Sequence, residues 1–242
     1  MPKGSSESET NGGKDPASLR DGYRTTFEQN LTYSVPDDEK KDFVPVTLEV
    51  ASTEYKSYMH AVHGMIYCFG ECILWDRYKQ SGQILMQMRC DGMVGFPGGL
   101  MDQDYDEPIV DCLNREMAEE INLDLEKYKF LQSDYLLSHV NHRKKLVTHF
   151  YIHQVTEVEI REIEFSTLKA KDWGHETFGT IRVPLFAMDD GFRGFPVFLA
   201  NRFAGNARDQ LLQGIVKCGL LSQKECDVYV KSFEEYIKRP HT

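Results

Sequence analysis

The sequence predicts an α/β fold, an α/β/α sandwich in which helices cover both faces of one mixed β-sheet. Short apolar runs rich in β-forming residues recur at positions 61–69, 83–89, 146–155 and 178–185. A helical period separates the second run from the third, and two helical segments follow the last run. Because strands and helices do not alternate regularly, a mixed sheet is favoured over a doubly wound parallel one.

The four strands are identified by different signals. The runs from Ala61 to Phe69 and from Gln83 to Arg89 are short and largely apolar, whereas Leu146 to Val155 alternates in polarity. Pro184 marks the end of the run from Phe178 to Leu185, because proline cannot donate a hydrogen bond to a neighbouring strand.

The helix between the second and third strands has the clearest signal. Apolar residues recur at every fourth position from Ile109 to Ile121, and Pro108 suits the first turn. Asn122 is suited to the C-cap because asparagine tolerates the left-handed conformation. Further helices are predicted at 157–169, 205–218 and 222–237, and the last opens with a Ser-x-x-Glu capping box.

Three segments differ in composition. Residues 1–21 are rich in Ser, Glu, Gly, Asn and Lys and poor in apolar residues, so we expect a disordered tail. Residues 22–54 form an extension, and the alternation from Val44 to Val50 predicts a strand that packs it on the domain. The compact domain is expected to occupy residues 55–242, a length sufficient for one core.

Composition excludes several classes of protein. No stretch approaches the roughly 18 consecutive apolar residues that cross a bilayer, and the N-terminus lacks a signal peptide. We therefore expect an intracellular protein that is not associated with a membrane. The six cysteines form no C-x-x-C pair and are expected to be reduced thiols rather than zinc ligands. The net charge of -10 argues against general nucleic-acid binding, so any RNA contact has to be local or bridged by metal ions.

An acidic face is predicted on the helix that ends at Ile121. Glu116, Glu119 and Glu120 are spaced i, i+3 and i+4, so their carboxylates project from one side of the helix. These like charges repel each other at about 0.2 to 0.5 kcal/mol per pair. Such a face is either a solvated, salt-bridged surface or a site for hard cations such as magnesium or manganese, which prefer oxygen ligands.

A glycine loop before this helix favours the cation site. Gly98 and Gly99 follow an apolar strand, and their backbone can approach a phosphate or donate a carbonyl to a metal. Together with Arg115-Glu-Met-Ala-Glu-Glu, this loop resembles the Nudix box. There are two departures: Gly99 and Glu107 lie two residues further apart than in the consensus, and Asn122 replaces the usual glycine. Neither departure removes an expected ligand.

The resemblance extends beyond the box. Residues 57–221 are similar to the snoRNA-decapping Nudix enzymes, also known as inosine diphosphatases, to which the non-catalytic syndesmos group is related. The similar segments are His60-Ala-Val-His63, Ile84-Leu-Met-Gln-Met-Arg89, Gly95-Phe-Pro-Gly-Gly99, Thr148-His-Phe-Tyr, Ala170-Lys-Asp172, Ile181-Arg-Val-Pro-Leu185 and Gln210-Leu-Leu. The resemblance implies a Nudix fold, a homodimer, and a location in the nucleoplasm and nucleolus, with some protein in the cytoplasm.

The same resemblance implies roles for individual residues. The metal ligands would be the carbonyl of Gly98 and the carboxylates of Glu116, Glu119, Glu120 and Glu176. Nucleotide contacts would come from His63, Arg89, Leu100 and Gln210. Arg115 would orient the carboxylates through a bidentate pair. Glu119, Glu120 and Glu176 are assigned to catalysis, and either Glu120 or Glu176 takes the proton from the attacking water.

The implied activity is metal-dependent hydrolysis of a phosphoanhydride bond. The substrates would be the 7-methylguanosine cap of RNA (snoRNA or mRNA) and inosine or deoxyinosine diphosphate. Two alternatives stay open: a pyrophosphatase acting on ADP-ribose, NAD or FAD, and a non-catalytic RNA-binding protein. Basic residues 142–145, expected in a loop before a strand, are either an RNA contact or a solvated hairpin tip.

Overall fold

The computed structural model describes residues 42–102 and 107–238, so the predicted tail and the extension up to position 41 lie outside the described residues. Strands form one sheet in the order β1-β6-β7-β2-β3-β4, with β5 beside β2 and β8 beside β3. They are β1 (Phe43–Val46), β2 (Met59–Leu74), β3 (Tyr78–Arg89), β4 (Val94–Gly95), β5 (Gly98–Leu100), β6 (Tyr135–Asn141), β7 (Leu146–Gln154) and β8 (Thr177–Arg182). The pair β2 and β7 is parallel and the other pairs are antiparallel, so the sheet is mixed.

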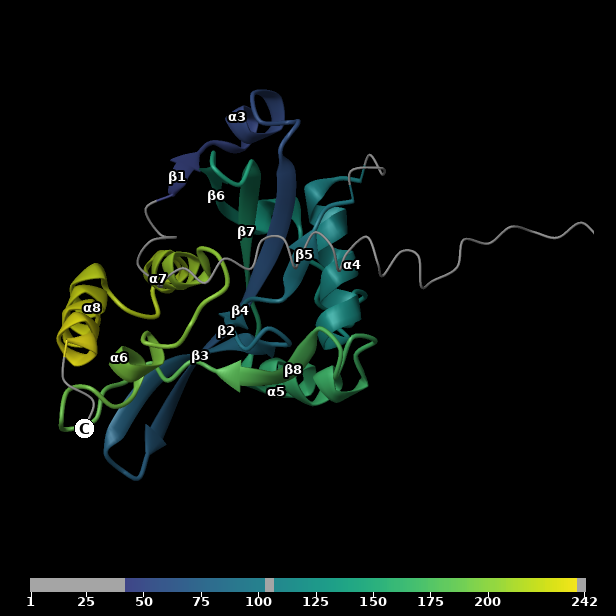
Figure 1. The fold of residues 1–242 in the computed structure, drawn as a ribbon. Helices are drawn as coiled ribbons and strands as arrows, with labels where there is room; N and C mark the ends of the chain where they lie inside the picture. The colour runs from purple at the N-terminus through teal and green to yellow at the C-terminus, as the bar shows by residue number, and fades with distance from the viewer. Residues whose placement is uncertain (1–41, 103–106, 239–242) are drawn as a thin grey trace, which may run out of the picture. The chain divides into compact units, whose positions relative to one another are not determined.

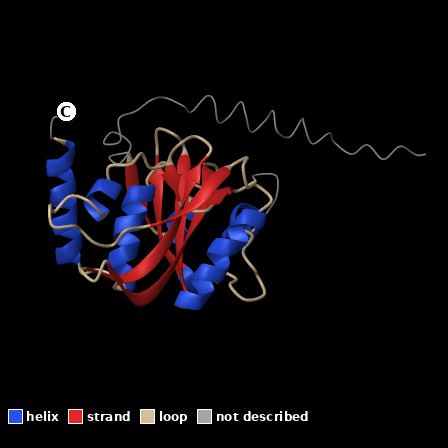
Figure 2. Cartoon of the chain, turned by 90° about the horizontal axis from the view of Figure 1, so that it is seen from below, coloured by secondary structure: helices blue, strands red, loops and turns tan. Residues whose placement is uncertain are grey.

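Helices cover both faces of the sheet, which confirms the predicted α/β/α sandwich (Figure 1). Figure 2 shows the helices on both sides of the strands. The helices are α3 (Leu48–Thr53), α4 (Ile109–Ile121), α5 (Glu157–Ser166), α6 (Phe195–Phe198), α7 (Ala207–Cys218) and α8 (Gln223–Ile237), with short 3-10 helices η1 (Gln132–Asp134) and η2 (Thr167–Lys169).

Two large apolar clusters, one on each face of the sheet, form most of the core, and a small third cluster joins Ala51 to Val140 and Val147. Helices α4 and α5 bury Leu113 and Ile160 with Val62 of β2. Helices α6, α7 and α8 pack on the other face with Met65 and Phe150. None of the helices in the described ranges is long and apolar enough to cross a bilayer.

Helix α4 follows its sequence signal closely. Leu113, Met117 and Ile121 are buried as predicted. The helix ends at Asn122, whose φ of 51° and ψ of 44° are left-handed. Pro108 lies at the N-cap, one position before the first turn.

Three local predictions differ from the structure. Residues 48–50 do not continue β1 but begin α3, because the hydroxyl of Thr47 caps this helix by accepting a hydrogen bond from the N–H of Val50 at 3.2 Å. Gly98 and Gly99 lie in a short strand instead of a loop. Strand β6 was not predicted, because buried polar residues such as Ser138 interrupt its apolar alternation.

Candidate active site

The three glutamates on α4 occupy one region but have different partners. Glu116 and Glu119 both accept hydrogen bonds from Arg115, at 2.5 Å and 3.4 Å. Arg115 also lies 3.5 Å from the carboxylate of Glu107. Lys171, in the segment after η2, donates to Glu119 at 2.6 Å. Two cationic side chains therefore offset the repulsion within the acidic face. Arg115 orients Glu116 and Glu119 through one nitrogen, Nη1, instead of forming the expected bidentate pair with one carboxylate.

Glu120 is the buried member of the trio, with 3% of its surface exposed. One of its carboxylate oxygens accepts hydrogen bonds from Nε2 of Gln87 at 2.9 Å and from the backbone N–H of Gly98 at 2.7 Å. Burial raises the pKa of Glu120 to about 7, and the charge of Glu116 adds to this rise, although the two hydrogen bonds oppose it. A carboxyl that titrates near neutral pH can accept and release a proton, as a general base must.

The two glycines of β5 let the acidic helix approach the sheet. Gly98 has a φ of 135°, and a Cβ there would collide with the carbonyl oxygen of Val62 on β2. A Cβ at Gly99 would lie 2.5 Å from a carboxylate oxygen of Glu116. Any larger residue would displace β2 or Glu116, so this pair sets the separation between α4 and the centre of the sheet.

The segment between η2 and β8 brings a fourth carboxylate to the same region. The N–H of Asp172 donates to the carbonyl of Glu119 at 3.1 Å, and the N–H of Cys90 donates to the carbonyl of Glu176 at 2.9 Å. This segment therefore ties α4 to the end of β3. The side chain of Glu176 is exposed, and its pKa is raised by partial desolvation and by the charges of Asp172 and Glu119.

These carboxylates fit a divalent cation by their chemistry. Burial foremost, and then the charges of Glu119 and Glu176, raise the pKa of Glu116 against the effect of Arg115. A bound cation would relieve this repulsion, and oxygen donors are the ligands that magnesium and manganese prefer. As arranged, no three His, Cys, Asp or Glu side chains in the described ranges converge closely enough to hold an ion. Arg115 instead bridges Glu116 and Glu119.

His63 and Gln210 lie on the other face of the sheet, beside α7. Side chains two positions apart on a strand share a face, so His63 points the same way as Met65. Met65 lies under Gly214, where a Cβ would be 3.0 Å from its sulfur. Helix α7 starts beside His139, which Asn206 contacts at 3.3 Å, and His139 is level with the β2 residues before Met65.

Gln210, one turn before Gly214, therefore lies over the strand positions around His63. His63 Nδ1 and Gln210 Nε2 are both buried without a hydrogen-bond partner. Burial and the charge of Arg89 lower the pKa of His63 to about 4, so its ring is neutral at neutral pH. These two atoms thus are polar groups that a bound base can satisfy.

The two other expected nucleotide contacts lie on β3 and β5, which both pair with β2. The guanidinium of Arg89, at the end of β3, donates to the carboxylate of Asp91 at 3.0 to 3.3 Å. Leu100 on β5 pairs with Ala61 and is 37% exposed. Asp91 therefore holds the guanidinium of Arg89 at the end of β3, and the charge of Arg89 acts on both His63 and Glu120.

Sequence reasoning missed Gln87 and Asp91. Gln87 donates to Glu120, and Asp91 binds Arg89. A polar residue inside the apolar run Ile84 to Met88 was a signal available for Gln87. Asp91 had no such signal, because only the turn after β3 brings its carboxylate back to the guanidinium.

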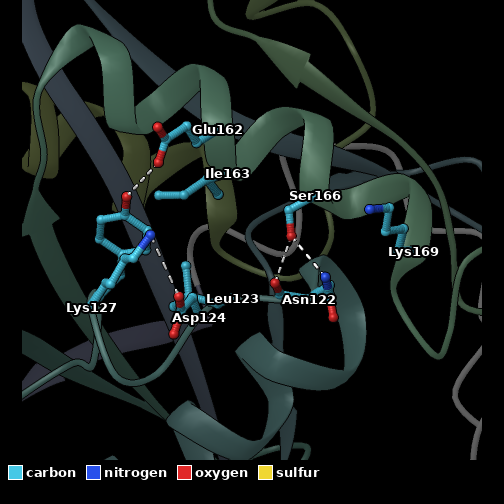
Figure 3. Close-up of a pocket in the computed structure, with 9 residues that line it drawn as sticks. Asn122, Leu123, Asp124, Lys127, Glu162, Ile163, Ser166 and Lys169 are labelled. Atoms are coloured by element: carbon cyan, nitrogen blue, oxygen red, sulfur yellow. Dashed lines mark hydrogen bonds and ion pairs between the residues drawn. The ribbon is translucent and has the colours of Figure 1, made fainter.

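Two cavities lie away from these residues. One of about 430 Å³ separates the end of α4 from α5 (Figure 3). Its polar groups bind each other: Asn122 Nδ2 donates to Ser166 at 2.9 Å, and Tyr128 donates to Glu162 at 3.1 Å. The other, of about 310 Å³, lies among α6, α7 and α8. Neither is lined by Glu116, Glu119 or Glu120.

Comparison with known proteins identifies the family of this chain. A family model described as Nudt16-like, U8 snoRNA-decapping enzyme-like, matches residues 60–221. The U8 snoRNA-decapping enzyme of Homalodisca vitripennis is 43% identical over 65% of this chain and 84% of its own length. The U8 snoRNA-decapping enzyme of Bos taurus is 40% identical over 67% of this chain and 83% of its own length. A Tudor-interacting repair regulator protein of Gallus gallus is 39% identical over 69% of this chain and 52% of its own length. The expected resemblance is confirmed, and the chain belongs to the Nudt16-like family of Nudix hydrolases.

Proposed function

We propose that this protein removes the 5′ cap of RNA by hydrolysing a phosphoanhydride bond with the help of a divalent cation. The observation that carries the proposal is Glu120, a buried carboxyl with a pKa of about 7 that lies beside Glu116 and the β5 glycines. Relatives that share about two thirds of this chain are named U8 snoRNA-decapping enzymes.

The metal ion would be magnesium or manganese. Its ligands would be Glu116, Glu119 and Glu176 together with the carbonyl of Gly98, so that Glu120 stays free to accept a proton. When bound, such an ion neutralises charge on the phosphates and lowers the pKa of a water molecule. Arg115 would lose some of its hydrogen bonds to Glu116 and Glu119 when a cation binds these carboxylates.

Glu120 is the better candidate for the general base. Gln87 and the N–H of Gly98 fix its carboxylate, and its pKa allows it to accept a proton near neutral pH. Glu176 is exposed on a loop and lacks a comparable pair of orienting hydrogen bonds among the described contacts. We therefore place Glu176 as a ligand rather than as the base.

The nucleotide would enter on the His63 side. The neutral ring of His63 and the amide of Gln210 would contact the purine, Leu100 would pack against it, and Arg89 would meet the phosphates. The products would be 7-methylguanosine diphosphate and RNA, and inosine or deoxyinosine diphosphate would be further substrates. By the same resemblance we propose a homodimer in the nucleoplasm and nucleolus, to be tested by light scattering and by imaging of the tagged protein.

One experiment tests the activity. Purified protein is incubated with capped RNA, inosine diphosphate, ADP-ribose, NAD and FAD, each with manganese, magnesium or a chelator, and the products are separated by chromatography. We expect 7-methylguanosine diphosphate from capped RNA only when a cation is present. Faster cleavage of ADP-ribose, NAD or FAD would replace the proposal with a pyrophosphatase.

A second candidate is a binding protein without turnover. The similarity to a Tudor-interacting repair regulator protein favours it, whereas the complete set of acidic residues on α4 argues against it. Absence of product from every substrate, with RNA binding that survives the chelator, would establish this second function.

A further inference from the structure

Three aromatic rings cluster at one end of the sheet, away from the carboxylates. The ring centroid of Tyr55 lies 5.2 Å from that of Tyr58 and 5.4 Å from that of His142, and Tyr58 lies 6.4 Å from His142. Two exposed basic residues, Lys56 and Lys145, belong to the same turns. We refer to these five residues as the ring platform.

Two turns far apart in the sequence build the ring platform. His142 and Lys145 lie in the tip of the hairpin between β6 and β7, which confirms the expected loop. The N–H of Met59 donates to the carbonyl of Lys145 at 2.9 Å, which joins this tip to the start of β2. The N–H of Tyr58 donates to the carbonyl of Tyr55 at 2.9 Å, so the second turn is closed by its own backbone.

The hairpin tip is basic although the molecule as a whole is acidic. The chain carries a net charge of -10, yet the hairpin tip reads His142-Arg-Lys-Lys145 and the facing turn contributes Lys56. Arg143 is paired with Asp42 at 2.8 Å, which anchors the tip to the residue before β1. Rings beside lysines are the combination that binds single-stranded nucleic acid, because bases stack on rings while ammonium groups contact phosphates.

We propose that the ring platform binds the single-stranded RNA body of the substrate. The proposal rests on RNA being the substrate, as argued above. Tyr58 precedes His63 by five residues, and an extended chain rises about 3.3 Å per residue, so the two backbone positions are about 17 Å apart along the chain. A few nucleotides span this distance, so one RNA molecule can occupy the platform and the nucleotide site together.

The test compares charge reversals at matched exposed positions. The double variant Lys56→Glu, Lys145→Glu changes the platform, and Lys224→Glu, Lys231→Glu on the exposed surface of α8 applies the same change of charge elsewhere. The single variant His142→Ala removes a ring without altering the lysines. Binding of uncapped single-stranded RNA of about 20 nucleotides is measured by fluorescence anisotropy over a series of salt concentrations, and circular dichroism checks the fold.

We expect the platform double variant to raise the Kd for uncapped RNA about tenfold and to reduce the salt slope by about 2. His142→Ala should raise the Kd about fivefold or more, since one base stack is worth about 1 to 3 kcal/mol. The α8 variant should bind within about twofold of the wild type. Equal weakening by both charge reversals, or by neither, would overturn the proposal.

Activity separates this proposal from the proposed function. Hydrolysis of inosine diphosphate should be unchanged in the platform variants, while the KM for capped RNA rises. One outcome is that neither the wild type nor any variant hydrolyses a substrate, while the Kd for uncapped RNA still rises in the platform variants. Decapping is then wrong and RNA binding by the platform stands. If capped RNA is cleaved with the same KM by the wild type and the platform variants, decapping stands and the platform fails.

Discussion

At the scale of single residues, Glu120 is the side chain of the candidate site whose ionisation destabilises the fold. Its carboxyl is 3% exposed and lies beside Glu116, so ionisation has to overcome both desolvation and repulsion. Hydrogen bonds from Gln87 and Gly98 recover part of this cost. A residue that destabilises the fold when it is charged is expected where chemistry requires it.

Replacing Glu120 with glutamine should stabilise the fold and reduce turnover. The folded-state pKa of about 7 lies above the ordinary value of 4.5. This group therefore contributes about 3 kcal/mol to the free energy of unfolding below pH 4.5, and this contribution is lost as the pH rises through 7. Glu120→Gln should raise the thermal midpoint at about pH 8 and lower the decapping rate about 100-fold or more.

Thermal denaturation and initial rates on capped RNA check both effects. Glu235→Gln, on the exposed surface of α8, is the matched control and should change neither quantity. Wild-type turnover in the Glu120→Gln protein would remove Glu120 from the site, whatever its effect on stability.

At the scale of secondary-structure elements, the contact between β5 and α4 depends on glycine. Gly98 adopts a left-handed φ and leaves no room for a side chain against β2. Gly99 in turn leaves room for the carboxylate of Glu116. The Gly-Gly pair is thus a requirement of packing as well as of the expected metal site.

Gly98→Ala should destabilise the fold by about 2 to 4 kcal/mol, because the new Cβ adds a backbone collision to an unfavourable φ. Gly92→Ala is the matched control, since Gly92 has a φ of 78° but nothing within 4 Å of a Cβ. The control should cost only about 1 kcal/mol. Urea unfolding midpoints measure both costs, and equal midpoints for the two variants would show that the predicted collision does not occur.

At the scale of the whole molecule, buried histidines make the fold sensitive to acid. His60 Nδ1 lies 2.9 Å from His149 Nε2, and His60 Nε2 lies 3.1 Å from the carbonyl of Tyr55. A carbonyl only accepts, so His60 carries its proton on Nε2 and His149 donates to Nδ1. The His60 ring is therefore neutral, and a further proton on its Nδ1 would set two N–H groups against each other.

Stability should fall as the pH drops below about 6.5. Burial lowers the pKa of His63 to about 4 and that of His149 to about 3, so these rings bind protons in the unfolded chain at pH values where they do not in the folded one. Their contribution is complete above pH 6.5 and is lost as the pH falls toward 4. Glu120 has the opposite effect between pH 4.5 and 7 and partly masks this loss.

The Glu120→Gln variant isolates the loss of stability that protonation of the histidines causes, because it removes the opposing contribution of Glu120. In this variant the thermal midpoint should decline steadily below about pH 6.5, by about 10 °C or more at about pH 4.5. The wild type should show a shallower decline over the same range. A flat profile in the variant would mean that the buried rings are protonated in the folded state.

Local features of the fold were accessible from the sequence because they depend on neighbours within about one helical turn. The period from Ile109 to Ile121, the cap at Asn122, and the spacing of Glu116, Glu119 and Glu120 all belong to this class. They fixed helix α4 and the presence of an acidic face. The strand order was not accessible, because β6 mixes buried polar and apolar residues and offers no alternation to detect.

By itself, the sequence determined that three carboxylates lie on one helix behind a glycine pair, because helical geometry follows directly from spacing. Only the tertiary structure decided that Glu120, rather than its neighbours, is buried and titrates near neutral pH. It also decided that the ring of Tyr55 lies beside that of His142. The physical reason is that burial and the meeting of distant side chains depend on the register of β2 with β7 and on the placement of α7, which spacing along the chain does not contain.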